Sequence, residues 1–400
     1  MLCIALAAAL TLLAPIATSA GTPAITTPEA LRSYLRDTPI ERSPLGALST
    51  GARKRFLARL EFGRNGLKTF STDDLANELT PAQAEALMAL FGAQTYVAGV
   101  GLSPAQYARI RQERAADAAR RGCAIDACPE SAIEQRYDAL VLSKQKHPGP
   151  DAARQAAIAA DYARLFAGDM RSSSLEGASA PDLRLLARAA HVALDADPDG
   201  RAADDLGRVL DAMQSRGMAD DAAFLPLYEA RVTTRHFDAA RRLALAHPGM
   251  TVAALPALET APTAAGQPTA LTVSADGRHM TRESIDLDVP LRIVVVAACH
   301  FSEDAARAIA SDPRLDALFR QHAVWLAADA TSPADAAAWN RAFPTQPIHI
   351  AWRQREWSML DSWAMPTYYV FRQGREVARW HGWLGLDTLG SELAKAGVSY

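Results

Sequence analysis

The sequence predicts a multidomain protein in which a mainly α-helical N-terminal part is followed by an α/β C-terminal domain. Three observations lead to this prediction. The chain has 400 residues, and domains usually hold about 100–200 residues each. Alanine-rich stretches with apolar residues at helical spacing occupy most of residues 21–254. From residue 270 onward, short runs of β-branched residues alternate with helical patterns, as is typical of an α/β sheet.

Residues 1–20 predict a secretory signal peptide. The stretch from Leu2 to Ala20 is uncharged, rich in leucine and alanine, and ends in small residues, which fits an apolar core with cleavage after Ala20. No lysine or arginine precedes the apolar run, so the alternatives are a start further upstream or a segment that stays as a membrane anchor. Export would place the protein in the periplasm or outside the cell, where disulfides persist.

Residues 21–148 predict a helical domain, because several helix starts are signalled. Thr27, Thr80 and Ser103 each stand before a proline, and a hydroxyl cap followed by proline at the first helical position is a typical helix start. A glutamine three residues after each of the last two caps completes a capping box.

A basic run lies in the same domain. Its lysines and arginines are interleaved with apolar residues at helical spacing, so we expect a solvated helix face, with anion binding as the alternative. The residues are Arg53, Lys54, Arg55, Arg59, Arg64 and Lys68.

Cys123 and Cys128 predict a disulfide. Apart from Cys299 they are the only cysteines beyond the signal segment, four residues separate them, and export favours oxidation. A metal site is not expected here, because the nearest histidine, His147, comes without a second cysteine pair. We expect neither a metal ion nor a cofactor in the protein.

Residues 149–254 predict a domain of helical hairpins. The segment from Leu227 to Pro248 resembles a degenerate tetratricopeptide unit, because small residues recur at helical spacing and a proline ends the second helix. No clean period of about 34 residues is present, so a regular array is not expected. Such helices either form a concave peptide-binding surface or position the last domain. Residues 255–269, rich in proline, alanine and threonine, predict a linker.

Residues 270–400 predict the α/β domain. Its first hairpin is expected from residues 270–274 and 285–289, with Asp276-Gly277 as the turn. The β-branched run from Leu291 to Val296 predicts a buried central strand. The further elements are a helix from Cys299 to about His322, a strand at 323–328, a helix capped by Ser332, a strand at 347–352, a hairpin of 367–371 with 376–380, and a last helix at 387–396.

Cys299 stands where the central strand is followed by a helix. At such a position, unpaired backbone N–H groups and a partial positive charge favour the thiolate over the thiol. His300 could add a donor or a positive charge, and Ser302 could hydrogen-bond the sulfur. Two carboxylates in the first turn, Glu303 and Asp304, act in the opposite direction. Cys299 is therefore the candidate nucleophile, with an inert core cysteine as the alternative.

A second stretch, Met365-Pro366-Thr367, precedes the second hairpin. Together with Cys299 it makes this domain resemble the thioredoxin superfamily, in which a cysteine motif opens a helix and a later cis-proline lies beside the reactive sulfur. The resemblance implies a thioredoxin fold, with Cys299 as the first motif cysteine and Pro366 as the cis-proline, which shapes a groove for an extended substrate. An added strand and helix make periplasmic members of the superfamily the more similar ones. The residues expected to line the groove are Trp363, Met365, Pro366 and Thr367.

One departure from the family limits the implied chemistry. Ser302 stands at the second motif cysteine, and a second thiol normally releases the mixed disulfide. The resemblance therefore implies thiol–disulfide exchange through a single cysteine, by capture, reduction or isomerisation of substrate disulfides. Release would fall to glutathione, to a partner thiol protein, or to the pair Cys123 and Cys128.

A redox-inactive function is the alternative, and Ser302 favours it. In this case the domain is a thioredoxin-like binding or scaffold module that holds a client polypeptide, so the sequence leaves open whether the protein is an enzyme. A protein or peptide partner is expected either way. The net charge of −3 gives no reason to expect nucleic acid, and membrane contact is expected only if the N-terminal segment is uncleaved.

Overall fold

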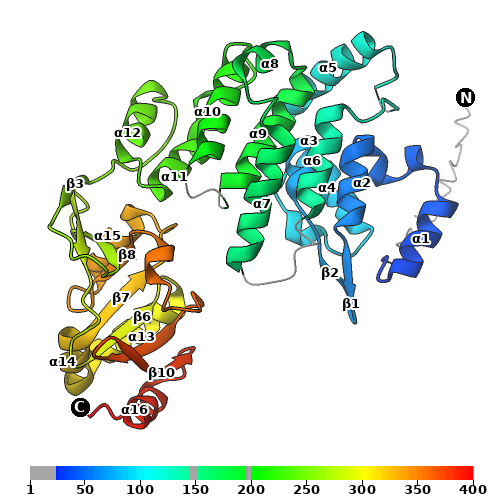
Figure 1. Cartoon of the computed structure of the whole chain (residues 1–400). Helices are drawn as coiled ribbons and strands as arrows, with labels where there is room; N and C mark the ends of the chain where they lie inside the picture. Colours follow the sequence, from blue (N-terminus) through cyan, green and yellow to red (C-terminus); the bar gives the residue numbers. More distant parts are fainter. Residues whose placement is uncertain (1–23, 126, 144–150, 195, 197–199, 400) are drawn as a thin grey trace, which may run out of the picture. The chain divides into compact units, whose positions relative to one another are not determined.

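The chain divides into two compact units (Figure 1). The computed structural model describes residues 24–125, 127–143, 151–194, 196 and 200–399. The predicted signal peptide and His147 therefore lie outside the described residues. The units comprise the described parts of residues 1–150 with 177–185, and of residues 151–176 with 186–400.

The first unit is mainly helical. Within its described residues, a short hairpin, β1 (Glu61–Gly63) with β2 (Gly66–Thr69), accompanies the helices. The helices are α1 (Pro28–Asp37), α2 (Thr50–Ala58), α3 (Asp73–Glu78), α4 (Pro81–Ala89), α5 (Pro104–Arg121) and α6 (Ala132–Ser143), with 3₁₀ turns at Ile40–Arg42, Pro44–Ala47 and Gln94–Val97.

The predicted helix caps are confirmed. Thr27, Thr80 and Ser103 each accept a hydrogen bond from the backbone N–H three residues further on. Both predicted capping boxes are present, because the side chains of Gln83 and Gln106 accept from the backbone N–H of their cap residues. The starts of these helices are determined by residues close together in the chain, so the sequence was sufficient to predict them.

The expectation of a solvated face for the basic run is wrong at Arg55. Its side chain is only 1% exposed and donates hydrogen bonds to Asp74, Glu134 and Asp138. In addition, α2 ends at Ala58, so the later basic residues of the run lie beyond that helix. Helical spacing could not reveal this burial, because the three carboxylates come from α3 and α6.

The second unit begins with helices. Among them, α11 and α12 pack side by side as a helical hairpin, inside the segment that resembles a tetratricopeptide unit. The helices that lie wholly or partly in this unit are α7 (Asp151–Phe166), α8 (Ser172–Gly177), α9 (Ala180–Leu194), α10 (Arg201–Gln214), α11 (Leu225–Thr233) and α12 (Phe237–Ala246), with a 3₁₀ turn at Asp221–Phe224.

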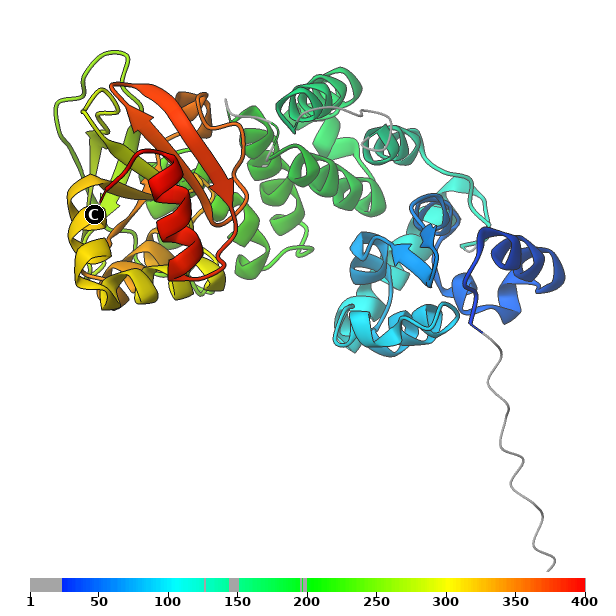
Figure 2. The same ribbon diagram turned by 90° about the horizontal axis from the view of Figure 1, so that it is seen from below.

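A mixed sheet follows. Among the described residues it has eight strands in the order β10-β9-β6-β7-β8-β4-β5-β3 (Figures 1 and 2). β6, β7 and β8 are parallel, whereas β9 is antiparallel to β6 and β4 is antiparallel to β8. The strands are β3 (Ala257–Thr260), β4 (Thr269–Val273), β5 (His279–Ser284), β6 (Arg292–Val296), β7 (Ala323–Ala327), β8 (Ile348–Ala351), β9 (Thr367–Arg372) and β10 (Arg375–His381).

Helices connect and flank the strands. Parallel neighbours need crossover connections, and α13 with α14 connects β6 to β7, while α15 connects β7 to β8. In Figure 2, α16 lies beside the β9–β10 hairpin. The predicted combination of a helical N-terminal part and a C-terminal α/β part is therefore confirmed. The helices of the α/β part are α13 (His300–Ser311), α14 (Pro313–His322), α15 (Pro333–Ala342) and α16 (Leu386–Lys395), with a 3₁₀ turn at Gln354–Trp357.

The helix expected after Cys299 is in fact two helices. α13 ends at Ser311, and the side chain of Asp312 accepts hydrogen bonds from the first backbone N–H groups of α14. Pro313 occupies the first position of α14, where its missing N–H costs nothing. The prediction of one continuous helix was therefore wrong at this cap.

Two strand expectations also differ from the structure. The strand that returns from β4 is β5, whereas residues 285–289 lie beyond it; Ile285 and Leu287 are buried core side chains outside any strand. The expected linker contains β3, which pairs in parallel with β5. The alternation of apolar and polar residues at 285–289 correctly indicated that the apolar side chains are buried. It could not indicate whether this segment pairs with β4 as a strand.

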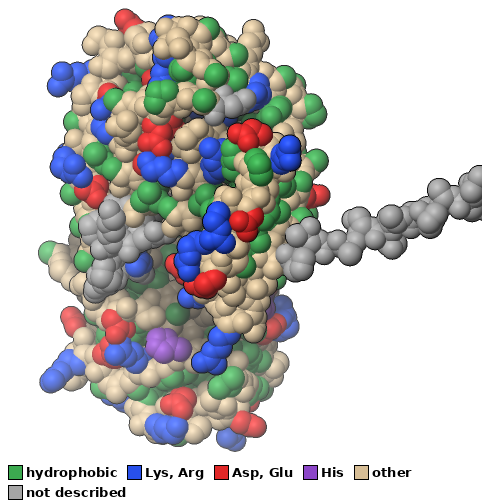
Figure 3. All heavy atoms as spheres, turned by 90° about the vertical axis from the view of Figure 1, so that its right-hand side faces the viewer, with side chains coloured by type: hydrophobic (Ala, Val, Ile, Leu, Met, Phe, Trp, Pro, Cys, Tyr) green, Lys and Arg blue, Asp and Glu red, His purple; other side chains and the backbone are tan. Residues whose placement is uncertain are grey.

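Buried side chains from the central strands form the core that fixes the end of β6. Val294 and Val296 pack in one cluster with Leu326 of β7 and with Tyr369 and Phe371 of β9. On the surface, Figure 3 shows Lys and Arg side chains interspersed with Asp and Glu side chains over one face, so both charge signs are present in that view.

Candidate functional site

Cys299 lies between β6 and α13. β6 ends at Val296 and α13 begins at His300, so Cys299 takes the position just before the helix, with extended backbone (φ −121°, ψ 167°). Ala298 before it has a φ of +139°, a region that residues with a side chain rarely adopt. The chain therefore changes direction sharply between the buried strand and the helix start.

The sulfur of Cys299 has two polar neighbours among the described residues. Its Sγ lies 3.3 Å from Oγ of Ser302 and 3.6 Å from the carbonyl oxygen of Met365. Cys299 is partly exposed, whereas Ser302 is fully buried. Ser302 therefore contacts the sulfur from inside the protein, and the exposed part of Cys299 stays open to solvent.

The register of β9 against β6 brings the loop with Met365 and Pro366 to the sulfur. Val296 pairs with Thr367, and the two strands are antiparallel, so the residues after Val296 run beside the residues before Thr367. The peptide bond between Met365 and Pro366 is cis. The hydroxyl of Thr367 donates to the carbonyl of Ala364 at 2.5 Å. This hydrogen bond closes the loop that contains Met365 and Pro366.

The other predicted site residues surround this centre without bonding to the sulfur. His300 is exposed, and its ring lies 3.8 Å from that of Phe301 between centroids; among the described residues it makes no hydrogen bond to Cys299. Trp363 is half-buried and packs against the core of the sheet. Phe301 and Met365 are 51% and 43% exposed, so both offer apolar surface near the thiol. Phe301 was not predicted, although an aromatic residue in the first helical turn was a visible signal.

Tyr368 is a buried residue near the thiol that sequence reasoning did not single out. It lies on β9 opposite Val295, and its ring stacks on Trp380 with 5.1 Å between centroids. Within the described part of the chain, its hydroxyl has no hydrogen-bond partner. Burial, and to a lesser extent the charge of Cys299, raise the pKa of Tyr368 well above its usual value. The hydroxyl therefore stays protonated across the physiological range.

A cleft of about 840 Å³ adjoins the site within the second unit, and we call it the hairpin groove. Its walls are formed by helices α9 and α11, the segment 251–255, the loop 328–332 and the start of α15. Ala298 and Met365 also line it, and both are neighbours of Cys299. The groove therefore opens next to the thiol.

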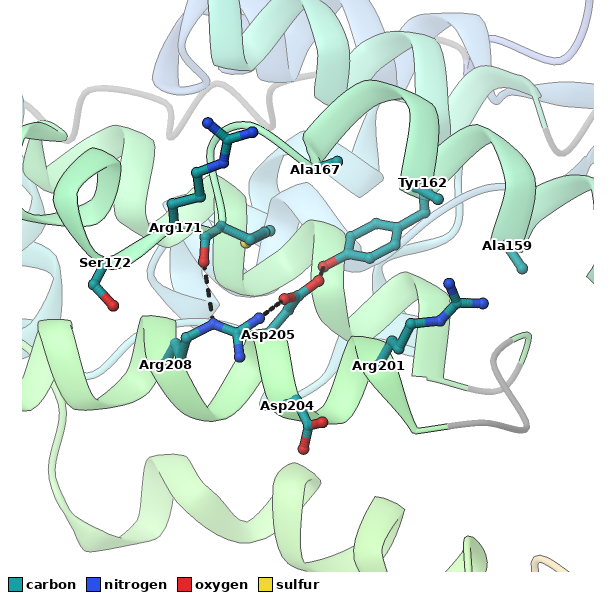
Figure 4. Close-up of a pocket in the computed structure, with 11 residues that line it drawn as sticks. Ala159, Tyr162, Ala167, Arg171, Ser172, Arg201, Asp204, Asp205 and Arg208 are labelled. Carbon is teal, nitrogen blue, oxygen red and sulfur yellow. Dashed lines mark hydrogen bonds and ion pairs between the residues drawn. The ribbon is translucent and has the colours of Figure 1, made fainter.

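Another cavity, of about 460 Å³, lies at α7 and α10 (Figure 4). Its polar groups largely satisfy one another: Tyr162 donates to Asp205 at 2.8 Å, and Arg208 bonds to Asp205 and donates to the carbonyl of Met170 at 3.1 Å. Asp205 is therefore paired with Arg208, whereas the cavity is also lined by Arg171, Arg201 and Asp204.

Two other cysteines lie within the described residues. Cys123 and Cys128 form a disulfide in the first unit, with 5.2 Å between their Cα atoms, and Cys299 of the second unit is free. The part of the chain that the structure describes holds no group of three or more His, Cys, Asp or Glu residues placed to bind a metal ion. None of its helices is both long and apolar enough to cross a membrane.

Comparisons of the chain with known proteins find no matching family model, no matching curated protein and no matching solved structure. Chemically, the site combines a partly exposed thiol, a buried hydroxyl and a backbone carbonyl, with apolar surface beside them. Such a site can hold a nucleophile next to a bound chain.

Proposed function

We propose that this is a thioredoxin-like protein that carries out thiol–disulfide exchange through Cys299. The observation that carries the proposal is the position of its sulfur, which is partly exposed at the start of α13 and 3.6 Å from the carbonyl of Met365, beside the cis bond to Pro366. The strand order supports it as well, because β9 pairs antiparallel with β6 and so brings the turn with Pro366 beside the strand that leads to Cys299.

The proposed reaction begins with the thiolate of Cys299. The N-terminus of α13 stabilises this anion, and the hydroxyl of Ser302 can donate to it. The thiolate attacks one sulfur of a client disulfide, the client S–S bond breaks, and the second client sulfur leaves as a thiolate that takes a proton from water.

Release of the client needs another thiol. In isomerisation, a second client thiolate attacks the mixed disulfide, Cys299 is regenerated, and no net oxidation occurs. In reduction, glutathione or a partner thiol protein supplies two thiols, which end as a disulfide while the client disulfide becomes two thiols. Ser302 cannot take part in either step, because its oxygen does not form the required S–S bond.

A binding function is the second candidate, and Ser302 is the observation that favours it. This residue is fully buried at the place where a resolving sulfur would act. If redox turnover is absent, the thiol site and the hairpin groove hold a client without chemistry.

The test is the rate at which Cys299 releases a coloured thiol from a small aromatic disulfide. We expect the folded chain to release this thiol faster than the same chain unfolded in denaturant, because the sulfur stands at the start of α13 beside a hydroxyl that can donate to it. In a chain that begins after Ala20, and so lacks Cys3, Cys299→Ser should release nothing. Equal rates in the folded and unfolded chain would refute the redox proposal and leave the binding function.

A gain-of-function variant sharpens this test. Ser302→Cys places a second sulfur where Oγ now lies 3.3 Å from Sγ of Cys299, a separation from which a small shift permits a disulfide. We expect this variant to form a Cys299-to-302 disulfide and to catalyse reduction of insulin by dithiothreitol faster than the parent protein does. A variant with two free thiols and no catalysis would argue against a thioredoxin-like site.

A further inference from the structure

We propose that the hairpin groove binds an extended, neutral to basic segment of the client polypeptide, so that the helical hairpin selects which disulfides reach Cys299. This inference rests on the proposed thiol–disulfide function and adds the recognition surface to it. It also assigns a role to the helices that precede the sheet.

The first argument is continuity with the thiol. Ala298 precedes Cys299 directly, the carbonyl of Met365 lies 3.6 Å from the sulfur, and both residues line the groove. A chain that lies in the groove therefore passes the thiol at one end. Its volume of about 840 Å³ falls within the range of ligand sites, about 300–1,000 Å³.

The second argument is that the walls are held in place by two reciprocal arginines. Arg235, in the turn between α11 and α12, donates to the carbonyls of Trp352 and Asp329, both at 3.0 Å, and of Ala351 at 2.6 Å. In return, Arg353, which follows β8, reaches the end of α11. It donates to the carbonyls of Thr233 at 3.1 Å and Thr234 at 2.6 Å.

These contacts are buried and strong. Arg235 is 8% exposed, and burial lowers its pKa to about 10, so the guanidinium is still charged at neutral pH. The ring of Phe237 also packs edge-on against Trp352, with 6.3 Å between centroids. The groove is therefore preformed, and preformed sites avoid much of the ordering cost of binding.

The third argument is the backbone of the segment 251–255. It belongs to no helix or strand, and the hydroxyl of Tyr228 donates to the carbonyl of Ala253. Within the described part of the chain, the other backbone N–H and C=O groups of this segment have no hydrogen-bond partner. Such an edge can pair with an extended partner chain, as in β-strand addition.

The fourth argument is charge. Glu229 of α11 and Asp335 of α15 line the groove, and none of its described lining residues is Lys or Arg. Glu229 is exposed and has no ion-pair partner among the residues that the structure describes. The other walls are mainly small apolar and hydroxyl side chains, with Leu225 36% exposed. These features favour a segment with small apolar residues and lysine or arginine over an acidic one.

The experiment uses the full chain and two synthetic peptides. Each peptide carries one cysteine bonded to a coloured aromatic thiol, and the two differ only in that two lysines of one are glutamates in the other. At low salt we expect the lysine peptide to react with Cys299 about fivefold faster than the glutamate peptide. Glu229→Lys should remove this preference or reverse it, and added salt should reduce it in the parent chain.

Matched leucine variants test the apolar wall. Leu225→Ser should slow both peptides about threefold, since part of the apolar contact is lost. Leu245→Ser, at a leucine of α12 that is 83% exposed and does not line the groove, should leave both rates unchanged. A small aromatic disulfide without a peptide should react as fast in Leu245→Ser as in the parent chain, and a reaction faster than that of the unfolded chain shows that each variant is folded.

The outcomes separate the two proposals. If the small disulfide reacts but the two peptides react equally fast, or if Glu229→Lys changes nothing, the groove inference is refuted and the exchange function stands. If the small disulfide reacts no faster in the folded chain than in the unfolded chain, both proposals fail.

Discussion

Replacement of Arg235 by methionine tests whether the helical hairpin and the sheet are held together as one structure. The change removes all hydrogen bonds from the guanidinium while keeping a long apolar side chain of adaptable shape. The carbonyls of Trp352, Asp329 and Ala351 then lose their donor in a place where water has little access. The backbone of Arg235 has a φ of +61° in the parent chain. Neither arginine nor methionine is glycine, so the strain of this conformation is similar in both proteins.

The magnitude follows from burial. A hydrogen bond from a charged donor contributes about 1.5–3 kcal/mol, but removal of Arg235 also removes the cost of burying its charge. Each buried carbonyl left without its donor costs about 1–3 kcal/mol, so for three carbonyls, less the recovered cost of burying the charge, we expect a net loss of about 3–5 kcal/mol in the free energy of unfolding. Arg235→Lys keeps the charge but not the planar fork, and should lose about half as much.

Urea unfolding followed by tryptophan fluorescence is the assay. All seven tryptophans lie between residues 325 and 383, so the signal reports on the α/β part alone. With a slope of about 2 kcal/mol per molar urea, the midpoint should fall by about 2 M. The control is Arg307→Met, an arginine 62% exposed in an ion pair on α13, which should cost less than about 0.5 kcal/mol. Equal midpoints for the two variants would contradict the argument that Arg235 fastens the unit.

Three other changes have defined outcomes. Ala298→Gly should raise the unfolding free energy by about 1 kcal/mol in the same fluorescence assay, because the strain of a side chain at φ +139° exceeds the entropy that glycine gains in the unfolded chain; a loss of stability would show that the conformation is not strained. Arg55→Met should destabilise the first unit by about 3–5 kcal/mol, since it removes the buried guanidinium that binds Asp74, Glu134 and Asp138; hydrogen exchange of α2 and α6 peptides measures this loss, with exposed Arg32→Met as the control. Burial raises the pKa of Glu134 above its ordinary value of 4.5, although Arg55 acts against this, so the ionisation of Glu134 weakens the folded state as pH rises through the folded pKa. Glu134→Gln should therefore make the protection of those peptides less dependent on pH above 4.5, and an unchanged pH profile would refute this assignment.

The elements that sequence analysis predicted well are those with local causes. The β-branched run before Cys299 and the caps at Thr80, Ser103 and Ser332 depend on residues close together in the chain, and each formed the expected element. The break at Asp312 was also local, but the continuous apolar pattern on both sides of it obscured the cap.

What could not be predicted depends on partners far apart in sequence. The burial of Arg55 needs acids that come 19 to 83 residues later. The hairpin groove combines α9, α11 and loops of the α/β part, and no single stretch of sequence contains enough of it to be recognised. For Cys299, the chain position was readable, whereas the orientation of its sulfur toward Ser302 and Met365 required the register of β9 against β6.

The reciprocal arginines have a consequence for modularity. A shortened chain that starts at residue 270 would keep Arg353 but lose the carbonyls of Thr233 and Thr234, and the carbonyls after β8 would lose Arg235. It would also lack β3, which covers one edge of β5, and an uncovered edge strand promotes aggregation. We therefore expect a chain that starts before α11 to be more stable and less prone to aggregation than one that starts at residue 270.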